Sequence, residues 1–110
     1  MSNQPSKHGS TPWGVADHCE EVAPGILSIS TPSHGGYWVD LTRLSQIRAT
    51  FPGLTKTFAG LPWFEEDCDW VYVVLGCPEA FDAGHVEDAR RQLALMRKHD
   101  AHWGMVAAHE

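Results

Sequence analysis

The sequence predicts an α+β domain in which a small three-stranded antiparallel sheet packs against about three helices. β-branched and aromatic stretches between glycine and proline residues predict the strands in the first third of the chain. Apolar residues at three- and four-residue spacing predict the helices that follow. The 110 residues suit a single domain, and 43% hydrophobic residues is close to the globular norm of about 45–50%.

The predicted sheet covers residues 15–39. Residues 15–23 form a weak first strand, because several of them are charged. Pro24-Gly25 has the sequence of a type II turn, since proline fits its first central position and glycine its second. Residues 26–31 and 37–39 are the second and third strands, with a loop between them.

Two helices have clear signals, and a third segment is ambiguous. Asp40 is a favourable N-cap for a helix over 41–50. Residues 85–99 carry acids near their start and bases near their end, as the helix dipole favours. The segment 63–77 has apolar spacing that favours a helix, although residues 70–75 also fit a buried strand.

The N-terminal residues, the lack of a long apolar stretch and the cysteines predict the extent of the domain and its cellular location. Residues 1–10 are polar and predict a flexible tail, which leaves 11–110 as a single globular domain. No stretch reaches the ~20 apolar residues of a membrane helix, and because residues 1–10 are polar we do not expect them to act as a secretory signal. Cys19, Cys68 and Cys77 lack disulfide or metal spacing, so we expect reduced thiols in a cytoplasmic, monomeric protein.

The motifs of common catalytic and metal sites are missing from the sequence. It has no Gly-x-Ser-x-Gly elbow, no Walker loop and no Cys-x2-Cys pair. His18 and His85 each begin a His-x-Glu triplet, but the Pro-Cys-x-x-Cys half of a zinc deaminase is absent. We therefore expect no enzymatic activity, no cofactor and no metal ion.

Charge is segregated along the chain, whose formal net charge is −6. Eight acidic residues and no Lys or Arg lie between Thr57 and Ala89. This balance disfavours direct nucleic-acid binding and favours a protein partner with a basic surface, although a solvated acidic face is the alternative explanation. The residues predicted to bind this partner are Glu65, Glu66, Asp67, Asp69, Glu20 and Glu21.

The loop Ser33-His34-Gly35-Gly36 is a second candidate site. Small side chains let the backbone come close to a ligand, and its N–H groups could hold an anion. The alternative is a tight connection that requires a positive φ at Gly35 or Gly36.

Five segments taken together resemble an uncharacterised domain family of bacteria, plasmids and phages. They are Thr11-Pro12-Trp13-Gly14, Ala23-Pro24-Gly25-Ile26, Ser30-Thr31-Pro32-Ser33-His34-Gly35-Gly36-Tyr37, Thr57-Phe58-Ala59-Gly60 and Trp63-Phe64-Glu65-Glu66-Asp67-Cys68-Asp69-Trp70. The resemblance covers about residues 11–81 and carries over no catalytic residue. It implies a mobile-element setting, in which small acidic proteins such as anti-CRISPR proteins counter host defences.

The first functional hypothesis is an anti-CRISPR or other anti-defence inhibitor. Its acidic face would bind a basic nucleic-acid-binding surface of a CRISPR effector complex and block target DNA. The alternatives are a small enzyme or ligand-binding domain that combines the 33–36 loop with the 65–69 acids, and a structural domain of a larger mobile-element system. A continuous acidic face without a pocket would favour the first hypothesis, and a cleft joining His34 to the acids the second.

Overall fold

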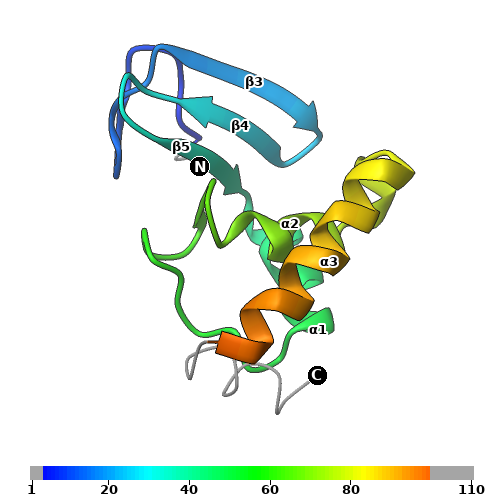
Figure 1. Cartoon of the computed structure of the whole chain (residues 1–110). Helices are drawn as coiled ribbons and strands as arrows, with labels where there is room; N and C mark the ends of the chain where they lie inside the picture. The colour runs from blue at the N-terminus through cyan, green and yellow to red at the C-terminus, as the bar shows by residue number, and fades with distance from the viewer. Residues whose placement is uncertain (1–3, 100–110) are drawn as a thin grey trace.

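In the computed structural model, which describes residues 4–99, a four-stranded antiparallel sheet lies beside three α-helices (Figure 1). The strands, in spatial order, are β3 (His18–Ala23), β4 (Ile26–Ser30), β5 (Gly35–Val39) and β6 (Trp63–Glu65). A separate hairpin of β1 (Ser10–Thr11) and β2 (Gly14–Val15) precedes them. The helices are α1 (Leu41–Thr50), α2 (Trp70–Gly76) and α3 (Ala83–His99), with a 3₁₀ turn η1 (Pro78–Ala80) before α3.

Local sequence signals account for two of the connections. Gly25 has φ +84° in the turn between β3 and β4, a left-handed conformation that glycine adopts without steric cost. At the start of α1, Asp40 Oδ1 accepts a hydrogen bond from the backbone N–H of Arg43 at 2.9 Å. The predicted turn and the predicted N-cap are both confirmed.

The main core lies between one face of the sheet and the helices. Alternate residues of a strand point to opposite faces, so β4, β5 and β6 each send part of their apolar side chains toward the helices. Figure 1 shows the helices gathered on this side of the sheet. The core includes Ile26, Val39 and Phe64 from the strands and Ile47, Phe51, Tyr72, Val73, Val86 and Leu93 from the helical half.

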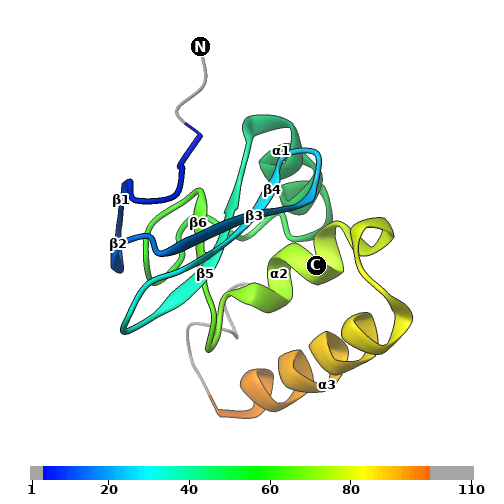
Figure 2. The ribbon, with the colours of Figure 1, turned by 90° about the horizontal axis from the view of Figure 1, so that it is seen from above.

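A smaller apolar cluster lies on the other face of the sheet. Leu27, Ile29 and Trp38 are buried there, with Trp13 and Trp63 packed against them. The rings of Trp13 and Trp63 meet edge to face, with centroids 5.6 Å apart. Figure 2 shows the β1–β2 hairpin beside the sheet. Trp13 lies between β1 and β2, and its packing against this second cluster holds the hairpin there.

The predicted three-stranded sheet is wrong by one strand. β6 pairs antiparallel with β5, so that Trp38 faces Trp63 and Tyr37 faces Phe64. The prediction of a helix over 63–77 is therefore correct only for its second half, which is α2. A three-residue strand such as β6 is stabilised by pairing with a distant strand and has little periodicity of its own.

The boundaries of the predicted domain also differ in part. Residues expected in the tail already make defined contacts, because His8 N–H donates to Ala16 O at 2.7 Å and Ser10 belongs to β1. Residues 100–110 of the predicted domain lie outside the described residues. Within 4–99, no helix has the length and apolar character needed to cross a membrane.

Candidate functional site

Three side chains that could bind a cation converge where β5 and β6 pair. Gly36 faces Glu65 in the ladder, and the backbone N–H of Glu66 donates to Gly35 O at 2.9 Å. His34 precedes β5, and Asp67 follows β6. As a result, one side-chain ligand atom from each of His34, Glu65 and Asp67 lies within 4.8 Å of the others. The structure thus brings the 33–36 loop together with acids of the 65–69 segment, as the ligand-binding alternative requires.

The backbone around His34 is held by the buried residue Thr31. Its hydroxyl donates to His34 O at 2.7 Å and accepts from His34 N–H at 3.1 Å. The N–H of Thr31 donates to the same carbonyl oxygen at 2.8 Å. These bonds close the chain between β4 and β5 into a tight turn and fix the point from which the His34 side chain extends.

The carboxylate of Glu65 is oriented by the backbone that follows it. Its Oε1 accepts from the N–H of Asp67 at 2.9 Å and from the N–H of Cys68 at 3.0 Å. Burial raises the pKa of Glu65, and the neighbouring Asp67 carboxylate raises this pKa further, while the two backbone donors oppose the shift. Glu65 and Asp67 are therefore a like-charged pair held at short range.

These side chains line a hollow of about 360 Å³. Its described lining combines two carboxylates and an imidazole with two aromatic rings and a thiol: Trp13, His34, Phe58, Glu65, Asp67 and Cys68. We name it the acidic hollow. No Lys or Arg belongs to this lining, and Phe58 is 67% exposed, which is unusual for a large apolar side chain. The hollow thus offers negative charge between aromatic walls.

The acidic hollow also gathers the segments that carried the family resemblance. Four of the five segments contribute to it, through Trp13, through His34, through Phe58, and through Glu65 with its neighbours. Sequence reasoning missed Trp13 and Phe58 as site residues. Their presence in these segments was the available signal, but nothing local indicated that they would meet.

Asp69 is not on the surface, contrary to the prediction that it contacts a partner. Only 1% of it is exposed. One carboxylate oxygen, Oδ2, accepts from the N–H of Phe58 at 2.9 Å and from the N–H of Glu65 at 3.4 Å. The reason is structural: the connection before β6 and the end of β6 both need an acceptor for these partly buried donors, and a carboxylate is a strong one.

The other predicted acids do not form one patch with the hollow. Glu20 and Glu21 lie on β3, the edge strand opposite β6, and three strand spacings of ~4.8 Å separate these edges by about 14 Å. They are consecutive strand residues, so they point to opposite faces of the sheet. Glu66 lines a second hollow. Of the six predicted partner-binding residues, Asp69 is thus buried, and the other five are distributed over several surfaces.

The glycines of the predicted loop have a different role from the expected one. Gly35 and Gly36 belong to β5, and neither has a positive φ, so that expectation is wrong. A Cβ on Gly35 would lie 2.5 Å from Ile29 O, and one on Gly36 would overlap the carbonyl oxygen of Phe64. The absence of a side chain allows close approach of adjacent strands.

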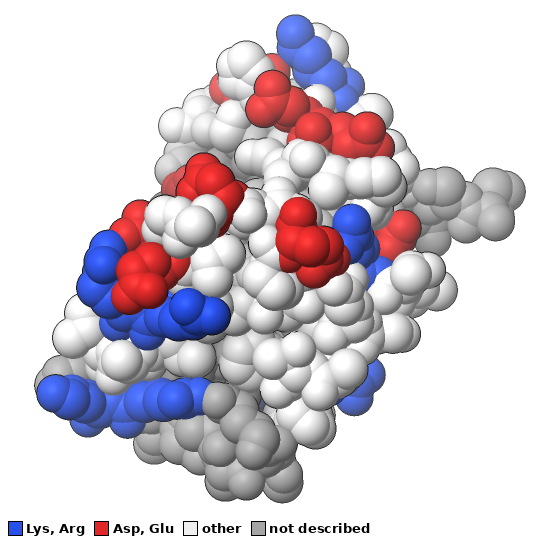
Figure 3. Space-filling view, turned by 90° about the vertical axis from the view of Figure 1, so that its right-hand side faces the viewer, with Lys and Arg blue, Asp and Glu red and all other residues white. Residues whose placement is uncertain are grey.

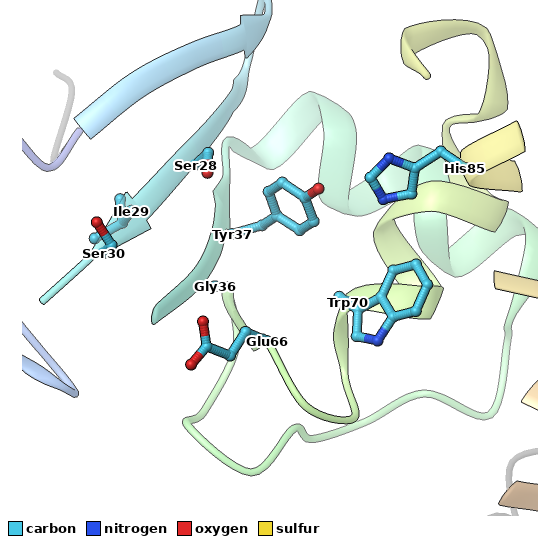
Figure 4. Close-up of a pocket in the computed structure, with 8 residues that line it drawn as sticks. All are labelled: Ser28, Ile29, Ser30, Gly36, Tyr37, Glu66, Trp70 and His85. Atoms are coloured by element: carbon cyan, nitrogen blue, oxygen red, sulfur yellow. The ribbon is translucent and has the colours of Figure 1, made fainter. Parts of the chain in front are cut away.

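The second hollow, which we name the aromatic hollow, has a volume of about 300 Å³. It lies between the sheet and the start of α2 and α3, and its described lining is Ser28, Ile29, Ser30, Gly36, Tyr37, Glu66, Trp70 and His85 (Figure 4). The ring centroid of His85 lies 5.5 Å from that of Trp70 and 5.2 Å from that of Phe81. The centroids of Phe81 and Tyr37 are 5.7 Å apart. Burial raises the pKa of Tyr37. The rings thus pack mainly on one another.

Acidic and basic side chains lie near one another on part of the surface. Figure 3 shows one side of the molecule, on which acidic groups are separated by uncharged residues and lie beside Lys and Arg. Among the ion pairs, Arg43 Nη1 lies 2.7 Å from Glu79 Oε2, and Arg91 pairs with Asp88. A continuous acidic face does not form on this side.

The fold and the site define a small α+β domain whose surface carries an acidic hollow with aromatic walls. The chain belongs to the family described as a domain of unknown function, DUF7007, which matches residues 6–109. Neither the curated proteins nor the solved structures gave a match to the chain. Membership of an uncharacterised family agrees with the resemblance in the sequence, and the mobile-element setting stays a prediction.

Proposed function

We propose that this domain is an anti-defence inhibitor that binds a basic surface of a CRISPR effector complex through the acidic hollow and so blocks target DNA. The observation that carries the proposal is the convergence of Glu65, Asp67, Trp13 and the exposed Phe58 in one hollow. The mobile-element setting implied by the family resemblance supplies the class of partner.

The chemistry of the hollow suits an arginine or lysine side chain. Nucleic-acid-binding surfaces are rich in both, because they neutralise phosphates. A carboxylate pair would bind the cationic group, and the face of Trp13 or Phe58 would attract it through a cation–π interaction. Within residues 4–99, no Lys or Arg forms an ion pair with Glu65 or Asp67, so these charges remain available to a partner.

Phe58 would contribute the apolar part of the contact. Binding hot spots combine a buried aromatic anchor with surrounding groups that exclude water. Phe58 is exposed in the free protein, and Asp69 fixes its backbone through the N–H bond of 2.9 Å. The partner-binding surface proposed here is thus Phe58 with Glu65 and Asp67, which replaces the set of six acids expected from the sequence.

A competition experiment tests this proposal. Purified CRISPR effector complexes would be titrated with the full chain, and their binding to labelled target DNA measured at two salt concentrations. We expect inhibition that weakens as salt rises, and a loss of about tenfold or more in the variant Phe58→Ala/Asp67→Lys. The control Asp88→Lys changes the net charge equally, on α3, and should inhibit like the parent chain.

Two results would contradict the inhibitor proposal. One is a parent chain that inhibits none of the effector complexes. The other is a folded Phe58→Ala/Asp67→Lys variant that inhibits as well as its parent, because the hollow would then have no part in binding.

A small-ligand-binding domain is the second candidate. The criterion set from the sequence favours it, because a hollow joins His34 to Glu65 and Asp67, and the side seen in Figure 3 carries no continuous acidic face. An imidazole carries no negative charge, so His34 adds nothing to the attraction for a basic surface. An imidazole beside two carboxylates is instead a usual set of ligands for a metal ion. If His34→Ala leaves inhibition intact, only the acids and rings serve the partner. A folded His34→Ala variant that loses function would identify the loop as a ligand site.

A further inference from the structure

We propose that His34, Glu65 and Asp67 bind a divalent transition-metal ion, with Zn²⁺ as the first candidate. This inference rests on the second candidate function above, because it names the ligand of that site. The cysteine spacing considered in the sequence could not have detected it, since the three ligands come from a turn and a strand end that are distant in the chain.

The geometry is close to that of a three-ligand metal site. The three ligand atoms already lie within 4.8 Å of one another. Ligands about 2.1 Å from a tetrahedral Zn²⁺ are about 3.4 Å apart, so modest side-chain rotation would complete the site. Because His34 and Asp67 are exposed, their side chains have room to rotate.

The ligand types favour a particular group of ions. An imidazole suits Zn²⁺, Co²⁺, Ni²⁺ and Fe²⁺ better than Mg²⁺ or Ca²⁺, which prefer oxygen ligands only. Three protein ligands leave further coordination positions open toward the hollow, as in zinc sites that bind water or another ligand. The metal would therefore face Trp13 and Phe58 across an accessible space.

The surrounding hydrogen bonds prepare two of the ligands. Glu65 Oε1 accepts two backbone N–H groups, so its orientation is fixed and Oε2 is left for a metal ion. The backbone of His34 is fixed by two hydrogen bonds with the Thr31 hydroxyl, which donates to His34 O at 2.7 Å and accepts from His34 N–H at 3.1 Å. Such supporting contacts reduce the ordering that metal binding would otherwise require.

The charges of the site also call for a cation. Glu65 and Asp67 each place a carboxylate oxygen within 4.8 Å of the other, and within the described residues neither forms an ion pair with Lys or Arg. A divalent ion would remove this repulsion. Bound metal would then reduce attraction for a basic partner, so metal and partner would compete for the hollow.

Calorimetric titration of the full chain with Zn²⁺ tests the inference. We expect one equivalent to bind, with affinity reduced by about tenfold or more in His34→Ala and in Asp67→Asn. His85→Ala, in the aromatic hollow, is the matched histidine control and should bind like the parent. Asp67→Asn preserves side-chain volume, so it keeps the test decisive if His34→Ala fails to fold.

Co²⁺ provides a second readout, because its absorption reports the ligand types. Nitrogen and oxygen coordination without a thiolate charge-transfer band would support the proposed set. A thiolate band, or Zn²⁺ binding that survives both His34→Ala and Asp67→Asn, would overturn it. Repeating the DNA competition in chelator and with added Zn²⁺ separates the two proposals. Because metal and partner would compete for the hollow, inhibition should persist in chelator and weaken when Zn²⁺ is added. A chain that inhibits but binds no Zn²⁺ in the calorimetric titration leaves the inhibitor proposal intact and overturns only this one.

Discussion

The acidic hollow and the aromatic hollow lie on opposite faces of the β5–β6 ladder. Glu65 and Asp67 face the first, and Glu66, between them in sequence, faces the second. Polar ligands converge in the acidic hollow, whereas rings of the aromatic hollow pack on one another. The difference teaches that a run of acids in a sequence is no unit of surface, because Glu65 ends β6 while Glu66 and Asp67 lie in the turn that follows, where the chain changes direction.

The largest effect is expected from Gly36→Ala, which breaks the ladder between the two hollows. A Cβ there would overlap the carbonyl oxygen of Phe64, so the strands must separate or shift. We expect a loss of about 3 kcal/mol of unfolding free energy, measured by urea denaturation. Gly84→Ala at the start of α3, where the nearest atom lies 3.4 Å away, is the control and should be neutral or stabilising. Equal stability of both variants would mean that β5 and β6 do not approach so closely.

Asp69→Ala should be the next most damaging change. It leaves the partly buried N–H groups of Phe58 and Glu65 without their carboxylate acceptor, at a cost of about 2 kcal/mol. Asp69→Asn keeps one acceptor oxygen and should cost less. Asp67→Ala, the exposed neighbour, should change stability by about 0.5 kcal/mol or less. Similar losses at 67 and 69 in thermal unfolding would contradict the division between a surface acid and a structural one.

A charge comparison sharpens the division between the hollows. Asp67→Lys should weaken partner binding by about tenfold, because it places a cation inside the acidic hollow. Glu66→Lys adds the same charge on the other face, and we expect a reduction of about threefold or less. The affinities of the two variants and of the parent chain for the partner, immobilised on a sensor surface, would be compared. If both substitutions weaken binding equally, the partner senses net charge and the hollow has no special role.

The smallest effect concerns the pKa of Glu65. Burial is the main reason that the pKa of Glu65 is raised, and the nearby Asp67 raises it further, so Asp67→Asn should bring this pKa closer to the ordinary value of a glutamate. A raised folded-state pKa means stability that is present below the unfolded-state value and lost as the pH rises through the folded-state value. Asp67→Asn should therefore flatten the decline of stability above about pH 4.5. Carboxyl NMR titration of Glu65 measures the shift, and an unchanged midpoint would show that Asp67 does not influence it.

Several elements could be predicted because their signals are local. Asp40 and the apolar spacing after it indicate α1, and Pro24-Gly25 indicates the first turn. The helix α3 begins at Ala83, two residues before the predicted start at 85. Asp82 directly precedes it, and its Oδ1 accepts a hydrogen bond from the N–H of His85 at 2.7 Å. Boundaries thus depended on hydrogen bonds that composition does not reveal.

The candidate site was predicted only in part. His34 and the acids at 65–67 were both singled out, and the expected distinguishing observation, a hollow joining them, is present. Trp13 and Phe58 were missed because an aromatic side chain in an irregular segment has no pattern that assigns it to core or surface. Asp69 was misassigned because its burial follows from the backbone donors of Phe58 and Glu65, which the chain brings near only after folding.

The sequence by itself determined the α+β class, the helices with capped and periodic patterns, and the concentration of negative charge. These depend on the residues within a few positions of each other, where sterics, capping and the helix dipole act. Only the tertiary structure decided that Trp63–Glu65 pairs with β5, and hence that the acids divide between two hollows and the core. Pairing between distant strands depends on contacts across the fold, and the direction of each side chain follows from that register.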